Sequence, residues 1–123
     1  FAPIEEGNLM KPGLLDVVCP QGATYSVNYQ WLIDDVGVDL TSYTAAMQVR
    51  ASYNAAEPLI DLASPADITL DDSGNIGVTI AADVTAAVPA GTYVWDIELT
   101  TGTTVYRLLQ GRWMHTAEVT RGD

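Results

Sequence analysis

The chain has 123 residues, of which 48% are hydrophobic and 17% charged, so we expect one domain with a packed core and exclude extensive disorder. Sixteen acidic residues against five basic ones give a net charge of −11, which disfavours nucleic acid and membrane surfaces as partners. One cysteine and one histidine exclude an intrachain disulfide and any multi-cysteine zinc site, and no cofactor is expected.

The first thirteen residues show the periodicity of neither a helix nor a strand. We interpret 1–13 as an extended N-terminal arm, 14–118 as a β-sandwich domain and 119–123 as a C-terminal tail. The apolar side chains of the arm are Phe1, Ile4, Leu9 and Met10. Together with Trp113, these four residues are the predicted contacts to other subunits.

Alternating apolar residues predict the first long strands. The pattern runs over 25–33, and after a turn at Asp34, Asp35 and Gly37 it returns over 43–51. We interpret these two runs as an antiparallel pair. Two shorter runs, 60–62 and 68–70, flank Pro65 and are predicted to be edge segments, because proline interrupts a ladder of hydrogen bonds.

The second half of the chain continues in the same way. The loop 71–75 is predicted to form a hairpin with the alternating run 76–80, and Asp83 to cap a short helical turn before Pro89. The run 93–99 is the best amphipathic strand of the sequence. The last strand, from 105 to about 114, changes phase, and we place a bulge at Gly111.

These elements predict an all-β protein, an immunoglobulin-like antiparallel sandwich of about seven strands with one short helical turn. Parallel pairing is not expected, because the connections are too short to hold crossover helices. The polar segment 115–123 is expected at the surface.

Candidate catalytic and metal-binding residues are few. His115 could join a serine and an acid in a triad, but no nucleophile-elbow motif is present, and Asp96 with Glu98 is better interpreted as a solvated strand face. We therefore expect no enzyme activity. The acidic loop 71–75 lacks the spacing of a calcium-binding loop, so we predict no metal site and leave open weak divalent-cation binding.

The remaining conspicuous residues are interpreted mainly as structural residues of the core. Cys19 is expected to be a small buried hydrophobe, and Trp31 and Trp95 lie in phase with the apolar faces of their strands. Trp113 is left open between the core and a sugar-stacking surface. The terminal tripeptide 121–123 spells an integrin-type motif by chance.

Four segments in register resemble one family. They are DLTSYTA at 39–45 with MQVR at 47–50, PAGTYVWDIEL at 89–99, RLLQG at 107–111 and EVTR at 118–121. Over about 14–121 the chain resembles the N-terminal domain of phage baseplate upper proteins and their stand-alone relatives in tailed phages. It departs from that family at Trp95 and Gln110, where we expect tyrosine and an acid, and in its apolar arm.

The resemblance implies an immunoglobulin-like sandwich present in several copies on the virion, in the tail, baseplate or fibre-attachment region. Its partners would be other virion proteins and copies of itself, and there are no catalytic residues to carry over. Two alternatives stay open: a capsid decoration (cement) protein, and a carbohydrate-binding adhesive module. The second predicts at least one tryptophan exposed in a shallow groove lined with Asp or Asn.

Overall fold

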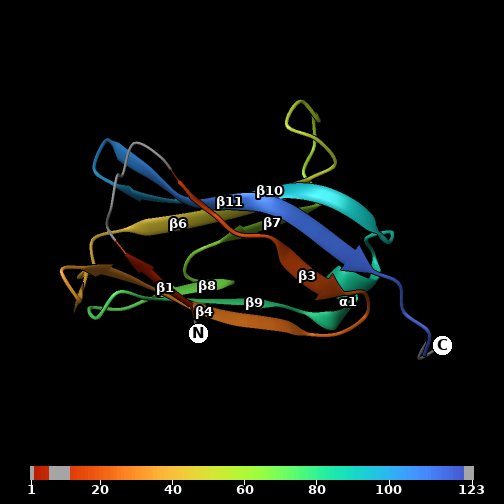
Figure 1. Cartoon of the computed structure of the whole chain (residues 1–123), viewed down its shortest axis with the longest axis horizontal. Coiled ribbons are helices and arrows are strands. Elements are labelled where there is room, and N and C mark those ends of the chain that lie inside the picture. Colours follow the sequence, from red (N-terminus) through yellow and green to blue (C-terminus); the bar gives the residue numbers. More distant parts are fainter. Residues whose placement is uncertain (1, 6–11, 121–123) are drawn as a thin grey trace.

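The computed structural model describes residues 2–5 and 12–120, which form two β-sheets packed face to face (Figure 1). The first, the β4 sheet, has the order β1 (Ala2–Glu5), β4 (Tyr25–Ile33), β9 (Asn75–Ile80) and β8 (Ile68–Leu70), and β5 (Val36–Gly37) also pairs with β4. The second, the β10 sheet, has the order β2 (Gly13–Leu14), β11 (Thr104–Thr116), β10 (Gly91–Thr101), β6 (Thr44–Arg50) and β7 (Ile60–Ala63), and β3 (Val17–Pro20) also pairs with β11.

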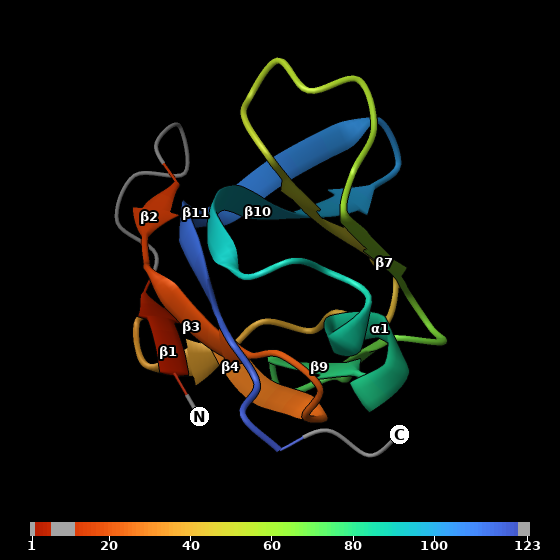
Figure 2. The same cartoon turned by 90° about the vertical axis from the view of Figure 1, so that its right-hand side faces the viewer.

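The predicted all-β sandwich with one short helical turn is confirmed. The described residues contain eleven strands, more than the seven or so expected, because several strands span only two to four residues. The single helix, α1 (Ala82–Ala86), lies at one end of the sandwich (Figure 2). Among the described residues, no helix has the length and apolar character needed to span a membrane.

Alternating side chains of both sheets fill the space between them, as the period of a strand requires. The core is rich in aromatic residues, and their rings contact one another across the two sheets. Tyr29 stacks on Trp95 with ring centroids 6.4 Å apart, and Trp31 meets Tyr106 edge to face at 5.4 Å. Trp31 and Trp95 are 1% and 2% exposed, which confirms their predicted core positions.

The predicted pairing of 25–33 with 43–51 is wrong, because the two strands lie in different sheets. Asp34 and Asp35 both have positive φ, 53° and 64°, and turn the chain sharply from β4 into β5. β5 pairs with β4 for two residues only, after which the chain crosses to the β10 sheet as β6. Alternation identified the buried face of each strand but could not identify its neighbour.

The short elements in the middle of the chain behave as expected. β7 and β8 are the terminal strands of their sheets, which confirms both as edge segments. β8 and β9 form the predicted hairpin around the loop 71–75, with Leu70 opposite Ile76. The expected cap of α1 is wrong: Ala81 is the N-cap without a side-chain hydrogen bond, and Asp83 lies in the first turn.

The longest hairpin joins β10 and β11, and its irregularity does not lie at Gly111. The register shifts where Ile97 faces Leu109 and Glu98 faces Arg107, so Leu108 is the extra residue. The bulge therefore directs both Leu108 and Leu109 into the core, where they are 3% and 7% exposed. Gly111 has a different role, because a Cβ there would lie 2.0 Å from the backbone oxygen of Leu15.

Parallel pairing, which the sequence did not lead us to expect, joins the N-terminal strands to the sandwich. β2 and β3 pair in parallel with β11, and β1 pairs in parallel with β4. The rule about short connections concerns strands adjacent in sequence, whereas here most of the chain lies between β3 and β11. The backbone of Ile4 in β1 thus lies opposite Trp31, while Phe1, Leu9 and Met10 lie outside the described residues.

Candidate functional site

Trp113, predicted as a surface contact, is a core residue. Its side chain is fully buried and contacts Trp95 and Tyr25 edge to face, with centroids 6.2 and 5.5 Å apart. The prediction that Trp113 contacts other subunits is therefore wrong. The exposed tryptophan that the carbohydrate-binding alternative predicts is also contradicted, because all three tryptophans are at most 2% exposed.

The prediction that His115 lies at the surface is also wrong. His115 is in β11, and its side chain is buried, with the residue 3% exposed. Its Nδ1 accepts a hydrogen bond from the Trp113 indole at 3.1 Å, and its Nε2 lies 2.8 Å from the backbone oxygen of Thr85. Because an indole can only donate, Nδ1 accepts and Nε2 donates, so the neutral tautomer is fixed. Both ring nitrogens are thus occupied by structural partners, and no serine hydroxyl of the described residues binds them.

Cys19 is fully buried, as predicted. Burial raises the pKa of its thiol to about 11, because the thiolate would be poorly solvated there. It therefore stays protonated and unreactive at neutral pH.

The acidic loop 71–75 uses its first carboxylate internally. Asp71 accepts hydrogen bonds from the backbone N–H groups of Ser73 and Asn75, each at 2.9 Å, and from the Asn75 side chain. These bonds, led by those from Asn75, lower the pKa of Asp71. Within residues 2–5 and 12–120, no group of three or more His, Cys, Asp or Glu side chains could hold a metal ion.

The outer face of the β4 sheet carries small uncharged polar groups. Ser26 and Thr79 share a hydrogen bond of 3.2 Å between their hydroxyls, and the Asn28 amide donates to Asn75 at 3.2 Å. Opposite Asn28, Gly77 leaves room beside Thr69 for a shallow depression lined by Ser26, Asn28, Thr69 and Thr79, among others. One carboxylate, that of Asp67 just before β8, also lines this depression. We call this surface the amide-hydroxyl face.

The outer face of the β10 sheet carries the charges. All three arginines of residues 12–120 lie on it, two of them paired with carboxylates. Arg107 contacts Asp96 at 3.3 Å and Glu98 at 3.1 Å, and Arg112 contacts Asp16 at 2.8 Å. Asp96 and Glu98 are predicted from the sequence to lie on a solvated strand face. Both side chains do point outward, and each is about one-third exposed.

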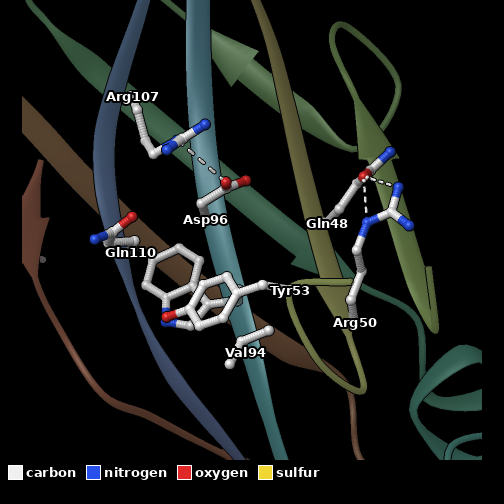
Figure 3. Close-up of a pocket in the computed structure, with 8 residues that line it drawn as sticks. Gln48, Arg50, Tyr53, Val94, Asp96, Arg107 and Gln110 are labelled. Carbon is white, nitrogen blue, oxygen red and sulfur yellow. Dashed lines mark hydrogen bonds and ion pairs between the residues drawn. The ribbon is translucent and has the colours of Figure 1, made fainter. Parts of the chain in front are cut away.

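A groove of about 200 Å³ crosses this face (Figure 3). The strand register places Gln48 and Gln110 on either side of Asp96, on neighbouring strands. The other residues that line the groove are Arg50, Tyr53, Val94, Trp95 and Arg107. We call it the Tyr53 groove.

Arg50 holds the wall of this groove in place. Its Nη1 donates to the backbone oxygen of Ala55 at 2.8 Å, and its Nε and Nη2 donate to the Gln48 Oε1 at 3.2 and 2.8 Å. The first bond ties the loop 51–59, which projects beyond the sheet in Figure 1, to β6. Tyr53 therefore lies on an anchored loop and is 74% exposed.

Asp96 is the one carboxylate in the groove. Partial burial raises its pKa, the neighbouring Glu98 adds to this effect, and Arg107 and Arg50 oppose it. The carboxylate is therefore less well solvated than an ordinary surface aspartate and available to a ligand's hydrogen-bond donors.

Sequence reasoning found Asp96 but missed its partners. The row Gln48, Asp96 and Gln110 becomes visible only when β6, β10 and β11 are aligned in register. Tyr53 gave no periodic signal, because it lies in a loop. The sequence marks Leu14 only as the start of the domain, yet it pairs with Gln110 and is 82% exposed.

Comparison with known proteins gives a likeness of fold. No protein-family model matches the chain, and no curated protein matches its sequence. Among solved structures, the N-terminal domain of ORF48 of phage TP901-1 is similar, with a TM-score of 0.55 and 7% sequence identity. The match covers 92% of this chain and 93% of that chain, so the two share a fold over almost their whole lengths.

Proposed function

We propose that this chain is a structural domain of a phage virion, in the tail, baseplate or fibre-attachment region, which acts by packing against copies of itself and other virion proteins. The observation that carries the proposal is the end-to-end likeness of fold to a domain of a phage protein. The resemblance of four segments to phage baseplate upper proteins, in the same order along the chain, supports it independently.

The distribution of charge supports packing through the amide-hydroxyl face. Two copies with a net charge of −11 repel one another wherever charged surfaces meet, and this repulsion is least where the surface is uncharged. The polar residues that point outward on β4, β8 and β9 are all uncharged: Ser26, Asn28, Gln30, Thr69, Asn75 and Thr79. Their hydroxyl and amide groups can also exchange hydrogen bonds with a neighbour.

Incorporation into particles tests the proposal. Virions purified from cells that carry this gene are expected to contain the chain, and labelling it for electron microscopy should place it on the tail or its distal end. A signal spread over the head at high copy number would overturn the tail assignment in favour of capsid decoration. Absence from purified particles would overturn the proposal itself.

A matched pair of substitutions tests the face. Thr79→Asp adds a charge to the amide-hydroxyl face, whereas Thr44→Asp adds the same charge to an exposed strand position of the β10 sheet. We expect Thr79→Asp to reduce incorporation at least tenfold and Thr44→Asp to leave it near the wild-type level. Equal incorporation of both variants would show that this face is not used.

A further inference from the structure

We propose that the Tyr53 groove is a binding site for a neutral saccharide, which would engage one sugar ring at a time. This inference is independent of the virion role proposed above, because the groove lies on the β10 sheet and the amide-hydroxyl face on the opposite sheet.

The first argument is the exposed aromatic ring. Tyr53 is 74% exposed and lines the groove, so its ring is accessible to a ligand that enters the groove. The hydrogen bond from Arg50 to Ala55 fixes the loop that carries Tyr53, so little conformational entropy is lost when a ligand packs on the ring. A rigid aromatic surface suits the apolar C–H face of a sugar.

The second argument is the set of polar side chains that line the groove together with Tyr53. Asp96 offers carboxylate oxygens, and Gln110, whose side chain is not hydrogen-bonded to any described residue, offers both an amide donor and an acceptor (Figure 3). Gln48 is held by Arg50, so its position is already defined. Hydroxyl groups, which both donate and accept, match this mixture better than a ligand with donors or acceptors only.

The third argument is charge and size. Arg107 is paired with Asp96 in the groove and with Glu98 beside it, and Arg50 is bound by Gln48 and Ala55, so both arginines of the groove already have partners within the chain. The net charge of −11 of the whole chain disfavours phosphates and acidic sugars. Its volume of about 200 Å³ is below the roughly 300–1,000 Å³ of sites that enclose drug-sized ligands. A single pyranose ring is the ligand class that combines neutrality, hydroxyl groups and this size.

Titration of the full chain with the methyl glycosides of glucose, galactose and N-acetylglucosamine, followed by two-dimensional NMR, tests the proposal. We expect saturable shifts of Tyr53 and of the Gln48 and Gln110 side-chain amides with at least one of these sugars. The Kd should be on the order of 1 mM, as suits a shallow site. Glucuronate and glycerol serve as charged and non-cyclic comparisons and are expected to bind at least tenfold more weakly.

Two matched pairs separate binding from folding. Tyr53→Ala is expected to weaken binding at least tenfold and Tyr53→Phe to retain it, because the aromatic face and not the hydroxyl packs on the sugar. Gln110→Ala is expected to weaken binding, whereas Gln30→Ala, on the other sheet, is not. The proposal is overturned if none of the three sugars gives saturable shifts, if Tyr53→Ala binds as well as wild type, or if glycerol or glucuronate binds equally well.

Discussion

At the scale of single residues, one buried hydrogen-bonded chain links three parts of the molecule. Trp113 donates to His115, which donates to the backbone of Thr85, and the Thr85 hydroxyl donates to the backbone oxygen of Ala23 at 2.8 Å. The chain joins β11, α1 and the turn before β4. A histidine in this position stabilises the fold because it accepts from the buried Trp113 N–H and adds a second donor to the Thr85 carbonyl oxygen, which also accepts from the Val88 N–H.

We expect His115→Leu to lower the free energy of unfolding by about 1–3 kcal/mol, because it leaves the buried Trp113 N–H without a partner. It also removes the 2.8 Å hydrogen bond to the Thr85 carbonyl oxygen, which then accepts only from the Val88 N–H at 3.3 Å. Urea denaturation followed by tryptophan fluorescence measures the loss. The exposed neighbour Thr116→Ala provides the control, and a similar loss in both variants would contradict the role given to the imidazole.

The Tyr29 hydroxyl differs from the His115 imidazole, whose two nitrogens are both hydrogen-bonded. This hydroxyl is buried and has no well-formed hydrogen bond among the described residues. Burial raises its pKa, and the nearby Tyr25 hydroxyl adds to this effect. We expect Tyr29→Phe to leave the stability unchanged or to increase it by up to about 2 kcal/mol, since it removes an unsatisfied polar group without loss of ring packing.

Tyr93→Phe is the matched control for that substitution. The Tyr93 hydroxyl donates to the backbone oxygen of Pro89, so its removal should cost about 0.5–1.5 kcal/mol in the same denaturation experiment. A clear loss of stability in Tyr29→Phe would show that its hydroxyl has a partner in solution.

At the scale of elements, the segment that carries β2 and β3 is attached to β10 and β11 by hydrogen bonds of different kinds. The Trp95 indole donates to the backbone oxygen of Leu15 at 2.9 Å, and Asp16 accepts from the backbone of Arg112 at 3.0 Å. These bonds require the two backbones to approach closely beside Gly111. A side chain at that position would separate them.

Gly111→Ala is therefore expected to lower the free energy of unfolding by roughly 2–3 kcal/mol, because the new methyl group would lie 2.0 Å from a backbone atom that cannot easily move. Gly102→Ala offers a contrast. Gly102 has a φ of 59°, but a methyl group there would have nothing within 4 Å, so only about 1–2 kcal/mol of backbone strain is expected.

Hydrogen exchange distinguishes the two effects. In Gly111→Ala the amides of β2 and β3 should lose protection, whereas in Gly102→Ala the change should stay within the β10–β11 turn. Retained protection of β3 in Gly111→Ala would contradict the close-approach argument.

At the scale of the whole molecule, the two outer faces differ in chemistry. One sheet carries the arginines of residues 12–120 with their acidic partners, and the other carries hydroxyls and amides. A single domain can therefore offer two distinct surfaces, one suited to packing with copies and one suited to a small polar ligand. Both proposals depend on this separation.

Four aspartates with shifted pKa values determine how the stability of the fold responds to acid. Hydrogen bonds lower the pKa of Asp16, Asp39 and Asp71 below 3.8, so these groups stabilise the fold above about pH 4 and lose that effect as the pH falls through their lowered values. Asp96 opposes them, since its raised pKa means that protonation favours the folded state.

We expect the urea midpoint to fall as the pH is lowered from 4 to 2, with Asp71 as a main contributor. The difference in stability between wild type and Asp71→Asn should be largest at pH 7 and shrink toward pH 2. Asp72→Asn is the control, because Asp72 accepts only a 3.4 Å bond from the Ser73 hydroxyl. A difference for Asp71→Asn that does not vary with pH would contradict the assignment.

Local patterns in the sequence are sufficient to predict the class of fold and much of the core. The alternation at 25–33 and 93–99 requires one apolar face per strand, and burying such faces requires two layers. The sequence also identified Trp31, Trp95 and Cys19 as buried, because their phase or their apolar character decides this locally.

The order of the strands in each sheet, and the contacts between side chains distant in sequence, are visible only in the folded structure. The sequence leaves Trp113 open between core and surface and places His115 at the surface with the polar C-terminal segment. Both residues are buried because the bulge in β11 lies at Leu108 and not at Gly111, and no local pattern marks the inserted residue. The pairing of β4 with β9, and the meeting of Tyr53 with Gln110, join positions distant in sequence. Alternation defines a face for each strand, whereas neighbours follow from the packing of the whole chain, which is a collective property.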